Sequence, residues 1–314
     1  MLQRLPYNFL SYSIFLLIGL VLIFLGFSNA NELIDLAGEE SLSLFNFVNI
    51  SSVTVNSLLV CLTLVITLFL IRGINRKYRF AENNPFPILF FVIVGMVAVP
   101  AQFIAIGSTI GLLFFLISLM VMLEIYNQPN VRGFIFLSAV VIGIGVLFYL
   151  PITLGLLLLF ITLAIFRPFE LRNFLVAIVG TLLPLIYYIF FCYFFEMDFP
   201  ITEFQFSQNA EPIILENEIT FPLFLLVGLF SMARIFIGRS KFIVRQRNQL
   251  LILFCYLLFL AVLVIFSSAA QIAIFTVPLL AVFISYLHKK VKKKWILEAI
   301  GLLIIGLSFW VKLS

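Results

Sequence analysis

The sequence predicts an all-α protein, a polytopic bundle of about eleven transmembrane helices that forms a single integral membrane domain over residues 1–314. Three observations support this prediction. Of the 314 residues, 64% are hydrophobic and only 11% are charged, whereas a soluble domain is about half apolar and a quarter charged. The mean hydropathy is +1.24. Apolar runs long enough to cross a bilayer also alternate with short polar connections along the whole chain, so lipid must be the solvent for most of it.

Each apolar run defines one expected span. The first run, Phe9–Phe27, is followed by Ser28-Asn29-Ala30, which has the small-x-small pattern of a signal-peptidase site. We expect this run to be retained as a helix, because the apolar core of a cleaved signal is usually only about 7–15 residues long. The expected spans are 9–27, 53–71, 85–103, 106–123, 133–148, 152–166, 174–195, 221–237, 250–266, 272–287 and 295–311.

Three pairs of these spans are joined by turns short enough to make tight hairpins, around Pro100-Ala101-Gln102, Tyr149-Leu150-Pro151 and Ser267–Gln271. At the second turn, Pro151 is expected to end the preceding helix, because the residue before a proline avoids the helical region.

The charged residues predict the orientation of the spans. Eighteen of the 19 lysines and arginines fall in connections on one predicted side, and only Lys312 falls on the other. Ten of the 14 acidic residues lie in two long connections on the opposite side, Asn29–Ser52 and Glu196–Thr220. Lysines and arginines beside membrane helices stay in the cytoplasm. We therefore expect a multi-pass membrane protein with the N-terminus in the cytoplasm and the C-terminus outside. The run His288–Lys294, HKKVKKK, is the strongest of these orientation signals because it holds five lysines.

Ionisable residues within the spans are rare. His288 is the single histidine and is expected to be an interfacial residue beside the lysines. Glu298 lies near a span end, from which its side chain is expected to reach the interface. One histidine and three separated cysteines predict no metal site and no cofactor. The polar residues within or beside the spans are expected to form hydrogen bonds between helices. They are Gln102, Ser108, Thr109, Ser118, Thr181, Tyr187, Tyr188 and Gln271.

The candidate site residues lie in the connections between spans. If the protein is an enzyme, Glu32 and Asp35 in the first acidic connection are the candidate catalytic carboxylates. The basic connections are candidates for binding lipid phosphate, a partner protein or the RNA of a docked ribosome. DNA is not expected as a partner, because the basic residues form short clusters between apolar runs. The basic candidates are Arg167, Arg172, Arg239, Arg245, Arg247, Lys289, Lys290, Lys292, Lys293 and Lys294.

Three short motifs carry a resemblance to a known family. They are the break LFYLP at Leu147–Pro151, the turn RPFELR at Arg167–Arg172 and the Gly-x-x-x-Pro pattern at Gly180–Pro184. On these motifs, Val131–Phe190 resembles an uncharacterised inner-membrane family of Bacteroidota, which implies no assigned activity. The resemblance implies a multi-pass protein of a bacterial inner (cytoplasmic) membrane, with the C-terminus periplasmic. More distantly, the hairpins and the acidic connection after the first span are similar to multi-span glycosyltransferases that use polyprenyl-phosphate sugars. That similarity implies a catalytic carboxylate at Glu32 or Asp35.

Two functions follow from these observations. The first is a non-catalytic integral subunit, a scaffold or accessory protein of an envelope-building or protein-export complex, with other membrane proteins as partners. It fits the scarcity of buried charge and the large apolar faces available for helix contacts. The second is a membrane glycosyltransferase, or an inactive relative, that uses the acidic connection. The sequence favours the first and leaves the second open.

Overall fold

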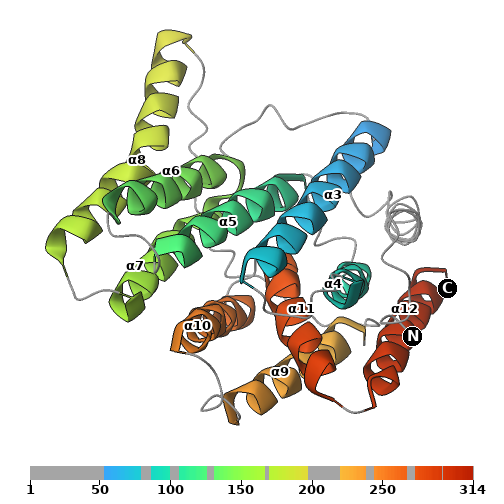
Figure 1. The fold of residues 1–314 in the computed structure, drawn as a ribbon. Helices are drawn as coiled ribbons and strands as arrows, with labels where there is room; N and C mark the ends of the chain where they lie inside the picture. Colours follow the sequence, from blue (N-terminus) through green and yellow to red (C-terminus); the bar gives the residue numbers. More distant parts are fainter. Residues whose placement is uncertain are drawn as a thin grey trace.

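The computed structural model describes residues 53–78, 86–99, 106–125, 131–166, 170–196, 220–237, 244–266, 273–291 and 293–313. Within these ranges every regular element is a helix and no strand occurs, which confirms the all-α class for this part of the chain (Figure 1). The first expected span and nearly all of the two acidic connections lie outside the described residues. The elements are α3 (Val53–Tyr78), α4 (Phe86–Ala98), α5 (Ile106–Glu124), α6 (Arg132–Phe148), the 3-10 helix η5 (Leu150–Thr153), α7 (Leu154–Phe166), α8 (Leu171–Phe194), α9 (Thr220–Ile237), α10 (Val244–Phe266), α11 (Ala273–Lys290) and α12 (Trp295–Leu313).

Five of the described helices are long and apolar enough to cross a membrane. They match a helical membrane protein, as the composition predicts. Shorter apolar helices, among them α4 and α6, lie between them. The five segments are Leu58–Tyr78, Ile106–Glu124, Leu171–Phe194, Thr220–Ile237 and Ala273–Lys290.

Several helices continue past the apolar runs into the basic connections, α3 and α10 furthest. Helix α3 ends at Tyr78, seven residues beyond the expected end of its span, and α10 begins at Val244, six residues before the expected start. The helices are thus longer than the expected spans, and the basic residues at their ends are helical. Lysine and arginine are good helix formers. Those in the last turn of α3, Arg76 and Lys77, also interact favourably with the negative end of the helix dipole.

The predicted break between the fifth and sixth expected spans is present. Helix α6 ends at Phe148, and Tyr149 takes an extended conformation with φ −150° and ψ 105° before η5 begins. The chain therefore leaves the helix two residues before Pro151, one residue earlier than proline stereochemistry alone predicts. The Tyr149 ring is buried at this point, where it stacks on the ring of Phe275 in α11 with centroids 5.6 Å apart.

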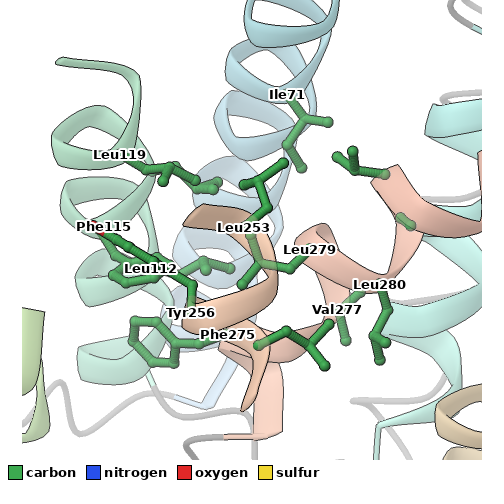
Figure 2. Packing of buried hydrophobic residues seen from close by; sticks show 14 of the residues in the cluster. Ile71, Leu112, Phe115, Leu119, Leu253, Tyr256, Phe275, Val277, Leu279 and Leu280 are labelled. Atoms are coloured by element: carbon green, nitrogen blue, oxygen red, sulfur yellow. The ribbon is translucent and has the colours of Figure 1, made fainter. Parts of the chain in front are cut away.

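The interior of the bundle is built around α4 and α11. All thirteen residues of α4 are buried, and 83% of the apolar window of α11 is buried. Helix α4 packs against α9, α11 and α12, while α5 and α10 pack against the other side of α11 (Figure 1). Figure 2 shows the resulting core, in which Leu112 and Phe115 of α5 meet Tyr256 of α10 and Phe275 of α11. A helix that is apolar on every face is stable only inside such a bundle or against lipid.

Small residues let α6 and α8 approach closely. A Cβ atom added to Gly180 of α8 would lie 2.8 Å from Ala139 Cβ and 3.0 Å from the carbonyl oxygen of Phe136. A Cβ atom added to Gly143 of α6 would collide with the carbonyl oxygen of Thr181 on α8. On each helix a glycine thus lies against the backbone of the other helix, which is a common way for membrane helices to pack. The Gly-x-x-x-Pro pattern of the sequence is part of this contact.

Candidate functional site

The structure brings together only some of the candidate site residues. Glu32, Asp35, Arg167, Arg239 and Lys292 lie outside the described residues. Arg172 is exposed in the first turn of α8, and Arg247 is exposed in the first two turns of α10. Arg245 belongs to α10, but its side chain is not described. The described lysines of the α11–α12 turn gather at one place, where three are exposed and Lys294 is half-buried; the three are Lys289, Lys290 and Lys293.

A buried pair of a histidine and a glutamate, which is an ion pair when the histidine is protonated, lies beside these lysines. His288 Nε2 is 3.1 Å from Glu298 Oε1, and the two residues are 0% and 6% exposed. His288 is in the last turn of α11 and Glu298 in the first turn of α12, so the pair joins the two helices across their turn. Glu298 was expected to reach the interface, and this was wrong, because its carboxylate is turned inward to His288. The expected interfacial depth of His288 stays a prediction, but its ring is covered by protein rather than exposed. The hydrogen bond between Nε2 and Oε1 gives each side chain a polar partner inside the protein.

The surroundings of the pair hold it in place. The Phe91 ring of the buried helix α4 contacts the His288 ring edge-on, with centroids 6.1 Å apart. Beside it, Phe90 packs so closely on α12 that a Cβ atom at Gly301 would lie 2.5 Å from its ring. Backbone hydrogen bonds order the turn itself: Val291 donates to Leu287, Ile296 to Lys293 and Glu298 to Lys294. Three helices therefore converge on the pair.

The sequence does contain a signal for this pair. In a helical hairpin, residues equally far from the centre of the turn lie opposite one another. His288 and Glu298 are each five residues from residue 293, so they are expected to face each other. The lysines dominate the local composition and favour the interpretation of the histidine as part of an exposed basic run.

A second ion pair joins α3 and α5. Lys77 Nζ is 2.9 Å from Glu124 Oε2, and the Tyr78 hydroxyl donates to the same carboxylate oxygen at 2.7 Å. The Lys77 side chain is 43% exposed, so solvent weakens this interaction far more than that of the buried pair. The basic end of α3 thus carries an internal counter-ion of its own.

Several polar groups in the helices bond as predicted, though not all of them between helices. The hydroxyls of Ser118 on α5 and Ser138 on α6 are 3.0 Å apart. Thr109 and Thr181 instead donate to backbone carbonyls of their own helices, at Ile106 and Ala177. These contacts explain the polar residues as packing elements of the bundle.

Helix α8 is the least buried of the five long apolar helices. Only 22% of its apolar window is buried, against 39–83% for the other four candidate spans. Its first half packs on α6 through Ala177, Gly180 and Pro184, but beyond Pro184 only Cys192 is buried. This second half leaves the bundle in Figure 1. Its exposed large side chains are Ile186, Tyr187, Ile189, Phe190, Phe191, Tyr193, Phe194 and Phe195.

No family model, curated protein or solved structure matches the chain. The resemblances drawn from the short motifs therefore stay predictions.

Proposed function

We propose that this chain is a non-catalytic integral subunit of a bacterial inner-membrane assembly and that it binds a partner membrane protein through the second half of α8. The exposure of α8 is the observation that carries this proposal. Beyond Pro184 the helix runs about 15 Å, given a rise of about 1.5 Å per residue, with almost every face uncovered by the described residues.

A partner helix would pack more favourably on this surface than lipid does. Membrane helices associate through close packing and interhelical contacts rather than through exclusion of water. The exposed half of α8 offers rigid aromatic rings that are already packed together, with Phe191 and Phe195 centroids 4.5 Å apart and Phe194 and Phe195 centroids 5.4 Å apart. Aromatic side chains lose little conformational entropy on binding and supply large contact areas.

Contacts between helix ends support the proposed arrangement of eleven spans. Lys77 and Glu124 join two ends that the charge pattern assigns to the cytoplasm, as do His288 and Glu298. The Thr220 hydroxyl donates at 3.3 Å to the carbonyl of residue 98, and both of these ends are assigned to the periplasm. Each contact pairs ends from the same proposed side. Alkaline phosphatase and green fluorescent protein fusions at residues 82 and 210 test the assignment, because the phosphatase should be active only at residue 210.

Site-specific photocrosslinking in cells tests the docking surface. A photoreactive phenylalanine analogue at Ile186, Phe190 or Phe194 should give discrete crosslinked bands containing another membrane protein, which mass spectrometry of the purified band identifies. Matched controls carry the analogue at Leu226 of α9 and Leu303 of α12, which are 66% and 54% exposed. The α8 proposal is wrong if α8 and control positions give the same products. Purification of the protein alone, with bound polyprenyl-phosphate lipid, would instead favour the glycosyltransferase and direct attention to the first acidic connection.

A further inference from the structure

The α11–α12 hairpin carries much more positive charge than it can neutralise itself. Residues 273–313 contain six lysines and one carboxylate, that of Glu298. This carboxylate is buried and bonded to His288, so it is turned to the interior rather than to the exposed Lys289 and Lys293. The basic end of α3 differs, because there Glu124 contacts Lys77 directly. The hairpin is therefore a place where an external anion would be favoured.

The two tryptophans of the chain place this turn at the edge of a bilayer. Trp295 and Trp310 are at opposite ends of α12 and are 63% and 75% exposed. Fifteen residues of helix separate them by about 22 Å, so rings at both ends bracket much of a hydrocarbon core that is about 30 Å thick. Tryptophan is enriched at both membrane interfaces. The lysines directly before Trp295 therefore lie at the level of the lipid headgroups.

We propose that the α11–α12 turn is a binding site for the headgroups of anionic phospholipids. Lys289 and Lys293 donate hydrogen bonds to the lipid phosphate from the two sides of the turn, with Trp295 against the upper part of the acyl chains. The His288–Glu298 pair is a positioning element. It holds the end of α11 against the first turn of α12, so that Lys289 at the end of α11 and Lys293 just before α12 face one site. The proposed function enters only in assigning this site to the cytoplasmic leaflet.

Bromine-labelled lipids can report on this site, because they quench tryptophan at contact. The full-length Trp310→Phe variant keeps Trp295 as the single tryptophan, beside the turn. It is reconstituted into bilayers of phosphatidylcholine with rising fractions of brominated phosphatidylglycerol, and separately with brominated phosphatidylcholine. We expect phosphatidylglycerol to be preferred about five-fold at Trp295, which corresponds to about 1 kcal/mol for lysine near an anionic surface. In the same background, Lys289→Gln with Lys293→Gln should reduce the preference to near one.

Matched variants separate a built site from general attraction to a basic protein. Lys77→Gln removes a lysine that has an internal counter-ion and should leave quenching at Trp295 unchanged. Glu298→Leu separates the positioning role from simple electrostatics, because leucine removes both the carboxylate charge and the hydrogen bond to His288. Loss of a negative charge should raise the preference for anionic lipid if charge alone matters, whereas loss of the positioning pair should lower it at least two-fold. His288→Leu should lower it likewise.

The results that overturn the proposal are equally specific. Equal quenching by the two brominated lipids in the Trp310→Phe protein would show that no anionic-lipid site exists at this turn. A preference that survives the double lysine substitution would place the site elsewhere. A rise with Glu298→Leu, in protein that elutes as a monodisperse peak, would remove the positioning role. None of these outcomes depends on α8, so failure here is distinguishable from failure of the docking proposal.

Discussion

Replacement of the buried pair of His288 and Glu298 by leucine, singly and together, should show strong coupling between them. The side chains are 1% and 9% exposed, and their nearest atoms are 3.1 Å apart. After His288→Leu, the Glu298 carboxylate would remain buried among apolar groups without its ring partner. After Glu298→Leu, the His288 imidazole would likewise remain buried without its carboxylate partner. Removal of one member of a buried pair typically costs about 3–5 kcal/mol.

The double variant should be more stable than either single variant. Replacement of a buried ion pair by apolar side chains of similar volume is often neutral or stabilising, because both charges are removed and neither is left alone. Leucine at position 288 can also still pack on the Phe91 ring, which contacts the histidine in the native protein. We therefore expect a coupling free energy of about 3 kcal/mol or more, compared with about 0.2–1 kcal/mol for an exposed pair.

Equilibrium unfolding in mixed detergent micelles with rising sodium dodecyl sulfate measures this coupling. The four proteins of the cycle are compared by tryptophan fluorescence, since both tryptophans lie on α12. The reasoning would be refuted if the double variant lost as much free energy of unfolding as the two single variants together. It would also be refuted if each single variant lost less than about 1 kcal/mol, the range of exposed pairs. Either result would mean that water reaches the pair in the native bundle.

Three further predictions concern packing and polar groups elsewhere in the bundle. Gly180→Leu should lower the free energy of unfolding by about 1–3 kcal/mol or more, because the larger side chain overpacks against α6. The control Gly306→Leu should be close to neutral in the same unfolding assay, because a Cβ atom added there has no neighbour within 4 Å. Glu124→Gln should lower the free energy of unfolding by no more than about 1 kcal/mol, because the Lys77 pair that it removes is half-exposed. A larger loss that is absent from the Lys77→Gln variant would assign the effect to another contact of the carboxylate. Tyr149→Phe should stabilise the protein by about 1 kcal/mol, because the buried hydroxyl has no hydrogen-bond partner in the described part of the chain; a clear loss of thermal stability would show that the hydroxyl is satisfied.

The elements of the fold were largely predictable from local sequence. Apolar run length located the helices from α3 to α12, and Pro151 marked the break after α6 to within one residue. The helix ends were less predictable, because hydropathy finds the lipid-facing part of a helix and not its last hydrogen bond. Helix α3 shows this, since it continues through Arg76 and Lys77. The span count and the orientation remain predictions from charge.

The candidate sites divide in the same way. The lysine run was evident from composition, because five lysines in seven residues need no fold to be recognised. The exposure of α8 was not evident, because its composition is as apolar as that of the other spans and only the packing on α6 shows which half is covered. The catalytic hypothesis for Glu32 and Asp35 concerns residues outside those that the structure describes.

The sequence by itself determined that this protein is helical and built for lipid, because composition and run length act locally and need no knowledge of neighbours. Tertiary structure decided which ionisable side chains are buried. A histidine beside five lysines looks exposed from its neighbours in sequence, yet the α11–α12 turn brings Glu298 to it and α4 covers both with Phe91. Burial of a charge depends on a partner being brought into contact, and that contact is a property of the packed hairpin rather than of either segment.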